Sequence, residues 1–174
     1  MEKFACEKKE NRNLNILIMK TTLIGLNLEK SEKLIESLNE LLANFQVYYQ
    51  NLRGLHWNIK GKSFFELHVK FEEFYTDSQE KIDLIAERIL TLEGTPLHTF
   101  DDYVKLAKVP VGKEITNDEK AVKLVVTSLA ELLKIERQIL ENSNDANDEG
   151  TNAMMSDFIS EQEKTIWMLN AWLN

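Results

Sequence analysis

Five residues of this sequence, His56, His68, Glu72, Asp83 and Glu87, have the types and the spacing that suit metal chemistry. His68 and Glu72 are four residues apart, as are Asp83 and Glu87, so each pair would lie on one face of a helix and could converge on one ion. At about 1.5 Å per residue, however, roughly 22 Å separate His68 from Asp83 along such a helix, far beyond the length of a metal bond. One helix therefore carries two halves of a site.

Two copies of such a helix could complete the site. If they cross antiparallel about a two-fold axis, His68 and Glu72 of one copy face Asp83 and Glu87 of the other, and this happens twice, as an isologous contact requires. A short hairpin would also bring His56, near the end of the preceding helix, beside His68. The alternative is that these carboxylates are solvated groups on a charged helix.

The donor types favour iron. Imidazoles and carboxylates without a thiolate argue against structural zinc and favour a harder ion with open coordination positions, Fe²⁺ or Mn²⁺, of which iron fits better. Di-iron centres inside a four-helix bundle use a Glu-x-x-His motif on two helices, and no Glu of this sequence is followed by His three residues later. The sequence therefore predicts an iron site between subunits rather than inside one.

The helix that would carry four of these residues has three faces when it is drawn at about 100° per residue. A charged arc, which contains Lys81 and Arg88, is expected to face water. A mixed arc combines the candidate ligands with Phe65, Ala86 and Leu90, which predicts a partner surface. The third face is an apolar stripe, expected to contact the rest of the domain, and consists of Leu67, Phe71, Phe74, Ile82, Ile85, Ile89 and Leu92.

The composition predicts one helical domain in a reducing compartment. Only 6 Gly and 2 Pro occur in 174 residues, which leaves few chain reversals and favours long helices over many short strands. Cys6 is the only cysteine and can form no internal disulfide, so the cytoplasm is the expected location. No apolar run is long enough to span a membrane, and the first residues do not resemble a signal peptide. A net charge of −10 over residues 21–174 disfavours binding to nucleic acid.

Apolar spacings of three and four residues predict four long helices and a short one, over residues 28–59, 63–94, 99–108, 116–142 and 151–174. Capping boxes are expected at Ser63 and Thr116, and Gly94 is expected to end the second helix in a left-handed conformation. Residues 142–150 are predicted to form a turn. Residues 1–20 are predicted to be a flexible extension, with Met19 as an alternative start, and residues 21–174 to be the folded domain.

The candidate ligands lie in motifs that resemble the Dps family of mini-ferritins. The motifs are LHWNIKG at 55–61, FFELH at 64–68, FEE at 71–73 and DLIAER at 83–88, within a similarity over about residues 21–173. The resemblance implies an all-α, ferritin-like four-helix bundle with a short extra helix between the second and third long helices. It also implies a hollow dodecamer with ferroxidase sites at two-fold interfaces, formed by His56, His68 and Glu72 of one subunit and Asp83 and Glu87 of its neighbour.

The function implied by this resemblance is oxidation of Fe²⁺ by hydrogen peroxide or O₂, storage of Fe³⁺ in the hollow oligomer, and protection against oxidative damage. The family often has Asp where this chain has Glu72, whose longer side chain could alter affinity at the weaker iron position. Trp57 resembles an aromatic residue that the family places near the site, with interface packing as the alternative. Asp145, Asp148 and Glu149 are expected to form a solvated acidic turn or, alternatively, to correspond to acidic three-fold pores that draw cations inward.

The competing function is that of an architectural protein that compacts DNA and has little ferroxidase activity. Only residues 1–20 could supply the phosphate contacts, and their net charge is no more than +2. The basic residues of this segment are Lys3, Lys8, Lys9, Arg12 and Lys20. A metal-free interaction bundle is a third alternative, which the complete set of five candidate ligands disfavours.

Overall fold

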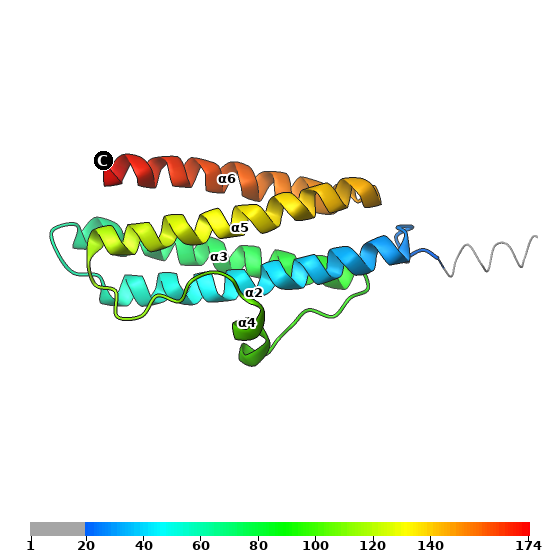
Figure 1. Ribbon diagram of the computed structural model, residues 1–174, viewed down its shortest axis with the longest axis horizontal. Coiled ribbons are helices and arrows are strands. Elements are labelled where there is room, and N and C mark those ends of the chain that lie inside the picture. The colour runs from blue at the N-terminus through cyan, green and yellow to red at the C-terminus, as the bar shows by residue number, and fades with distance from the viewer. Residues whose placement is uncertain (1–19) are drawn as a thin grey trace, which may run out of the picture.

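A computed structural model describes residues 20–174, which form four long helices and one short helix (Figure 1). The helices are α2 (Leu28–Asn58), α3 (Phe64–Thr91), the short α4 (Phe100–Leu106), α5 (Asp118–Ala146) and α6 (Glu149–Leu173). Within these residues β-type pairing is limited to one isolated bridge between Thr21 and Asn27. The predicted all-α fold, with a short helix between the second and third long helices, is confirmed.

The long helices run up, down, down and up, because the connection between α3 and α5 spans the length of the bundle (Figure 1). α2 and α3 form one antiparallel hairpin, and α5 and α6 form another. α2 packs along both α3 and α5, and α4 lies against α2. The connection ends where the Thr116 carbonyl accepts a hydrogen bond from the Lys60 N–H at 2.9 Å, so α3 and α5 start at the same end of the bundle.

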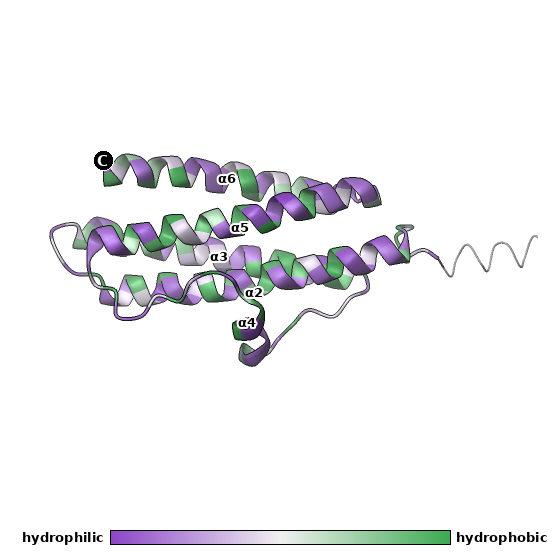
Figure 2. Ribbon diagram, viewed as in Figure 1, coloured by the Kyte–Doolittle hydropathy of each residue, from purple (hydrophilic) through white to green (hydrophobic). Residues whose placement is uncertain are grey.

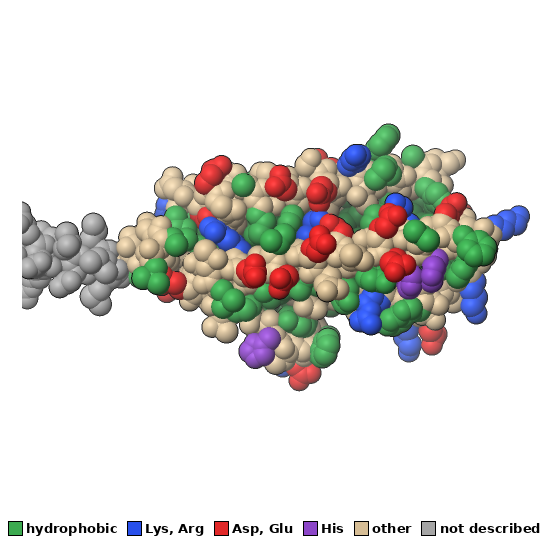
Figure 3. All heavy atoms as spheres, turned by 180° about the vertical axis from the view of Figure 1, so that it is seen from behind, with side chains coloured by type: hydrophobic (Ala, Val, Ile, Leu, Met, Phe, Trp, Pro, Cys, Tyr) green, Lys and Arg blue, Asp and Glu red, His purple; other side chains and the backbone are tan. Residues whose placement is uncertain are grey.

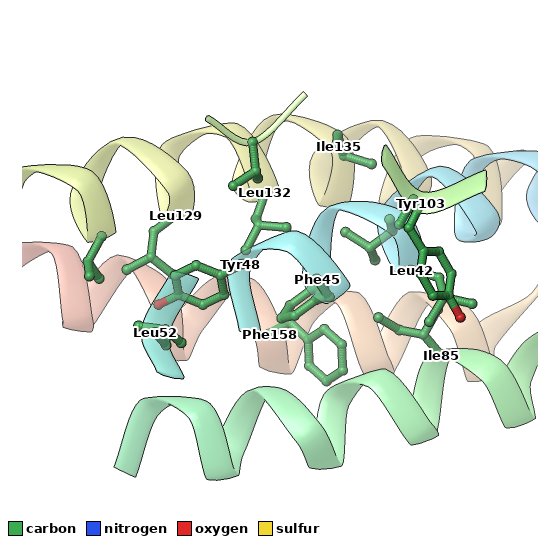
Figure 4. Close-up of a cluster of buried hydrophobic side chains, with 14 of the residues drawn as sticks. Leu42, Phe45, Tyr48, Leu52, Ile85, Tyr103, Leu129, Leu132, Ile135 and Phe158 are labelled. Atoms are coloured by element: carbon green, nitrogen blue, oxygen red, sulfur yellow. The ribbon is translucent and has the colours of Figure 1, made fainter. Parts of the chain in front are cut away.

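The hydrophobic core lies between the four long helices (Figure 4). Phe45 of α2 and Phe158 of α6 meet edge to face, with ring centroids 6.0 Å apart. Hydrophobic and hydrophilic residues alternate around each long helix (Figure 2), as expected for helices that bury one face. The apolar stripe predicted for α3 is confirmed, since its buried members are Leu67, Phe71, Ile85, Ile89 and Leu92 and its half-buried members are Phe74 and Ile82.

Polar side chains determine where three of the long helices begin. Asn27, Asn117 and Asp148 precede α2, α5 and α6, and each accepts a hydrogen bond from the backbone N–H three residues later. The cap of α5 is therefore Asn117 rather than the predicted Thr116. Ser63 precedes α3 as predicted, but its side chain makes no capping bond, because its backbone (φ −90°, ψ 17°) is not extended as a capping residue requires.

The end of α3 differs from the expectation for Gly94. The left-handed residue is Glu93 (φ 68°), and the Gly94 N–H donates to the Ile89 carbonyl, which closes the C-terminus of the helix. Gly94 is needed for another reason, because a Cβ at this position would lie 2.7 Å from the Ile35 side chain. Glycine here allows the end of α3 to approach α2 closely.

The predicted turn at residues 142–150 is mostly helical. α5 continues to Ala146, Asn147 adopts the left-handed conformation (φ 55°), and α6 begins at Glu149. The Asn and Asp residues of this segment favour turns, but Ser143 and Ala146 are buried against the bundle. Tertiary packing therefore extends the helix beyond the point where local preference would end it.

Three asparagines of α2, Asn39, Asn44 and Asn51, hold the long connection between α3 and α5. Their side-chain oxygens accept backbone N–H groups of residues 97–112 at 2.7 to 2.9 Å. The amides of Asn39 and Asn51 donate back to carbonyl groups of the same connection. These bonds satisfy backbone groups that lie outside regular secondary structure. This role was not predicted from the sequence, because it becomes visible only when the connection lies beside α2.

The described chain begins with a tight turn before α2, in which the Thr22 N–H donates to the Leu26 carbonyl at 2.8 Å. The predicted N-terminal extension, including Met19, lies outside the described residues except for Lys20. Among residues 20–174, no helix is both long enough and apolar enough to span a bilayer.

Candidate metal centre

The two predicted histidine ligands lie face to face at one end of the α2–α3 hairpin. His56 is in the last turn of α2 and His68 is near the start of α3. Their rings stack with centroids 3.7 Å apart and with 19° between the planes. The short loop at residues 59–63 brings the two helix ends to the same height, so the two imidazoles approach each other as the sequence predicts.

Each imidazole is oriented by the backbone of the other residue. Nδ1 of His56 lies 2.7 Å from the His68 carbonyl oxygen, and Nδ1 of His68 lies 2.8 Å from the His56 carbonyl oxygen. A carbonyl oxygen can only accept, so each Nδ1 carries the proton and donates it. With the proton on Nδ1, the nitrogen that can offer a lone pair to a metal ion is Nε2.

Glu72 lies one turn beyond His68 and is contacted by a tyrosine. The Tyr75 hydroxyl donates to Glu72 Oε1 at 3.3 Å, and the Tyr75 ring packs edge-on against His56 with a centroid distance of 5.4 Å. Desolvation, and then the charge of Glu72, raises the pKa of Tyr75, so its hydroxyl keeps its proton at neutral pH. Tyr75 was not predicted from the sequence to belong to the site, although its spacing of three residues from Glu72 was a usable signal.

Asp83 and Glu87 are exposed further along α3. In the part of the chain that the structure describes, no three His, Cys, Asp or Glu side chains come close enough to hold a metal ion. One chain thus presents two separate sets of donors on the surface of one hairpin. The assignment of all five residues as ligands of a shared ion stays a prediction, because it requires a second chain.

Large apolar side chains lie on the same helix surface as the donors. Phe65 is 83 % exposed, and Val69 and Leu90 are each more than half exposed. Figure 3 shows one side of the molecule, on which histidine and acidic side chains are interspersed with exposed apolar groups. Trp57, beside His56, is also exposed, and the Arg53 guanidinium lies 4.8 Å from the centroid of its ring. Such a mixed surface is typical of a contact with another protein.

The charged arc of α3 does not face water along its whole length, contrary to the expectation for Lys81. Lys81 is buried, and its ammonium group pairs with Asp77 of α3 and with Glu161 of α6, the latter at 2.8 Å. Burial by itself would lower the pKa of Lys81, but the two carboxylates outweigh this effect and raise it. The arc is covered here because α6 packs beside it, which the spacing within α3 cannot show.

Arg88 connects α3 to the start of α6, so it also differs from the expectation of a solvated charge. Its Nε donates to Thr151 Oγ1 at 2.9 Å, and its guanidinium group pairs with Asp148. Asp148 is buried, so neither the solvated turn nor the cation pore predicted from the sequence describes this residue. Asp145 and Glu149 are exposed on either side of it.

A second polar cluster lies inside the bundle. Glu136 of α5 is fully buried and accepts a hydrogen bond from the side-chain amide of Gln162 of α6. Glu136 Oε2 and Gln162 Oε1 have no hydrogen-bond partner in the described part of the chain. Burial raises the pKa of Glu136 to about 7, and Gln162 and Lys81 limit the rise. A cavity of about 320 Å³, lined in part by Tyr48, Lys81 and Gln162, lies next to this cluster.

Known proteins are similar to this chain both in sequence and in the arrangement of the helices. A family model described as a ferritin-like domain matches residues 35–174. A DNA protection during starvation protein from Porphyromonas gingivalis is 43 % identical over 148 residues, which are 85 % of this chain and 93 % of that protein. The chain belongs to the Dps family.

Two solved Dps structures agree with the assignment to this family. The Dps protein of Vibrio cholerae O1, described as a ferritin-like diiron-carboxylate protein, superposes with a TM-score of 0.88 at 53 % identity, over 89 % of this chain and 98 % of that chain. The Dps protein of Bacillus brevis superposes with a TM-score of 0.81 at 32 % identity, over 84 % of this chain and 98 % of that chain. This Dps chain therefore has the ferritin-like fold over most of its length.

Proposed function

We propose that this Dps protein is a cytoplasmic ferroxidase and iron store. Fe²⁺ binds where His56, His68 and Glu72 of one subunit meet Asp83 and Glu87 of a two-fold related neighbour. Hydrogen peroxide or, more slowly, O₂ accepts the electrons, and Fe³⁺ collects inside a hollow dodecamer. Oxidative damage is limited because the peroxide is consumed without release of hydroxyl radicals.

The observation that carries this proposal is the stacked pair of imidazoles with both Nδ1 atoms bound to carbonyl oxygens. This arrangement fixes the tautomer and the orientation of both rings, which is what a metal site requires of its histidines. The chemistry of the donors fits iron, which is the substrate here. Imidazoles fix the geometry, while carboxylates tolerate both charges of the ion and water or oxidant can occupy the open positions.

A second copy of this chain is the partner that the donors require. The row of exposed apolar residues Phe65, Val69 and Leu90 lies on the same helix as both sets of donors. An antiparallel pairing of two α3 helices would cover this row and bring each set of donors to the complementary set. The proposal therefore predicts two equal sites in each dimer.

Replacement of both His68 and Asp83 by Ala tests the site. The initial rate of Fe²⁺ oxidation by peroxide, followed by the absorbance of the ferric product, is expected to fall by about 100-fold or more. The oligomer should keep its size in sedimentation. His98→Ala is the matched control, since His98 is exposed and its Nδ1 lies within hydrogen-bonding distance of the Pro96 carbonyl two residues earlier, away from the candidate ligands in the sequence. An unchanged rate in the double variant would contradict the proposed site.

Mixed assemblies test whether the two sets of donors belong to different chains. His68→Ala and Asp83→Ala chains are each expected to be slow alone, but a mixed dimer keeps one site with both residues intact. When equal amounts of the two variant chains are unfolded and refolded together, the mixture should recover about a quarter of the wild-type oxidation rate. The reason is that about half of the randomly formed dimers are mixed, and each mixed dimer has one intact site out of two. Absence of any recovery would exclude a site shared between chains.

DNA binding is the second candidate, because relatives of this chain are named for DNA protection. The charge of −10 over residues 21–174 opposes it, so the contacts would have to come from residues 1–20. Duplex DNA that is retarded in a gel at low salt, and is no longer retarded after deletion of residues 1–18, would support this role. Unretarded DNA would leave iron oxidation as the function.

A further inference from the structure

Tyr75 lies between two candidate ligands that come from different helices. Its hydroxyl donates to Glu72 Oε1 on α3, and its ring lies at 87° to the His56 ring of α2. Tyr49 of α2 packs edge-on against Tyr75 at 6.2 Å, and the Arg53 guanidinium lies over the Tyr49 ring at 5.4 Å. The Tyr75 ring is thus held by side chains of α2, while its hydroxyl reaches a carboxylate of its own helix.

The two ligands need support for different reasons. Glu72 is exposed, and without a partner its long side chain would sample many rotamers. A hydrogen bond to Oε1 restricts the carboxylate and leaves Oε2 free for the ion. His56 is already held at Nδ1 by the His68 carbonyl, and the edge of an aromatic ring packed against its face limits tilting of the imidazole.

We propose that Tyr75 is a positioning residue, which sets the Glu72 carboxylate and the His56 imidazole in their metal-binding geometry before the neighbouring subunit supplies the remaining donors. This inference rests on the proposed function, because it requires Glu72 and His56 to be ligands. Tyr75 itself does not bind the ion in this arrangement. Its contribution is to metal affinity, and groups that orient metal ligands typically change affinity by about tenfold to a hundredfold.

Titration of the assembled protein with Fe²⁺ in the absence of oxidant, followed by calorimetry, tests this role separately from the oxidation rate. Tyr75→Phe removes the hydroxyl and keeps the ring, and it is expected to weaken Fe²⁺ binding by about tenfold. Tyr49→Phe is the matched control, because it removes a hydroxyl from the adjacent ring and leaves the contacts of Tyr75 with Glu72 and His56 in place. Its affinity should equal that of the wild type.

A double variant separates positioning from a general structural role. If Tyr75 acts mainly through Glu72, Tyr75→Phe should change the affinity by no more than about twofold when Glu72 is already Ala. The visible spectrum of bound Co²⁺ reports the ligand geometry, and it should change in Tyr75→Phe but not in Tyr49→Phe. Equal affinity of Tyr75→Phe and wild type, or an equal loss with and without Glu72, would overturn the inference.

The same titration distinguishes failure of this inference from failure of the proposed function. Wild-type protein that binds no Fe²⁺, or binds it equally well after His68→Ala, would refute the proposed function and the role of Tyr75 with it. If His68→Ala loses the binding and Tyr75→Phe retains it in full, only the role of Tyr75 is refuted.

Discussion

The bundle contains two polar regions that differ in how their groups are satisfied. Inside the bundle, the Lys81 ammonium lies between two carboxylates, and Glu136 is paired with Gln162. On the outer surface of the α2–α3 hairpin, His56 and His68 form hydrogen bonds within residues 20–174 only through Nδ1, which leaves their Nε2 atoms available. Most polar groups of the inner region find their partners within one chain, whereas the donor atoms of the outer region are left open to a partner or an ion.

Two adjacent residues of α3 illustrate the difference between polar groups with partners inside the chain and polar groups without them. Glu87 and Arg88 are neighbours in the sequence, but about 100° separates them around α3. Arg88 turns toward α6 and forms an ion pair there, while Glu87 is exposed. Polar groups that the chain satisfies by itself are expected to support the fold, and those that it leaves open are expected to bind a partner or an ion. Substitutions in the two regions should therefore affect different measurements.

Asp148→Ala should have the largest effect, a loss of about 4 kcal/mol in the free energy of unfolding. The substitution removes the N-cap of α6 and leaves the Arg88 guanidinium without its carboxylate partner. Urea denaturation at a fixed protein concentration measures the loss. Asp145→Ala, at an exposed position nearby, should change the value by no more than about 0.5 kcal/mol. Similar results for the two variants would show that the ion pair does not stabilise the fold.

Glu136→Gln should change how stability depends on pH. The pKa of Glu136 is about 7 in the folded chain and 4.5 in the unfolded chain, so between these values the folded protein holds a proton that the unfolded chain releases. This group therefore lowers the free energy of unfolding as pH rises from about 4.5 to 7, by about 3 kcal/mol in total, and has no further effect above pH 7.

Because Gln carries no charge, the stability of Glu136→Gln relative to wild type should increase by about 2.5 kcal/mol between pH 5 and pH 8. Urea denaturation at the two pH values measures this difference. Glu141→Gln, at an exposed position on α5, serves as the control and should follow the wild type. If the free energies of unfolding of wild type and Glu136→Gln depend on pH in the same way, Glu136 is ionised in the folded chain at neutral pH, contrary to the prediction.

Glu87→Gln should affect the outer region alone. The rate of Fe²⁺ oxidation is expected to fall by roughly tenfold to a hundredfold, because an amide is a weaker ligand than a carboxylate for a hard ion. The free energy of unfolding should stay within about 0.5 kcal/mol of wild type. Asp157→Asn on α6, another exposed carboxylate, should leave both values unchanged. A large loss of stability in Glu87→Gln would contradict the distinction between the two regions.

Lys81→Met should have the smallest effect, a loss of about 1 kcal/mol in the free energy of unfolding. Met fills the space of the buried aliphatic part of Lys81, and the carboxylates of Asp77 and Glu161 are more than half exposed, so water can replace the ammonium group. Thermal or urea denaturation measures the change, with the exposed Lys164→Met as control. A loss above about 3 kcal/mol would mean that the ion pairs themselves hold α3 to α6.

The features predicted correctly from the sequence are those that depend on residues near one another along the chain. Helical periodicity located the long helices, and the short loop after α2 placed His56 beside His68. The capping errors at Ser63 and Thr116 are local, but the other errors occur where distant segments meet. Gly94 is required by contact with Ile35, and α5 extends past residue 142 because its last turn is buried. The orientation of both Nδ1 atoms also depends on carbonyl groups of the opposite helix.

The sequence by itself determined the helical fold and the spacing of the donors along α3. It also showed that one helix cannot bring all of these donors to one ion, because helix geometry fixes both rise and rotation per residue. The tertiary structure decided which charges are buried, which carbonyl groups orient the imidazoles, and which tyrosine contacts Glu72. Burial and hydrogen bonding are properties of neighbours in space, and α6 and α2 become neighbours of α3 only when the chain has folded.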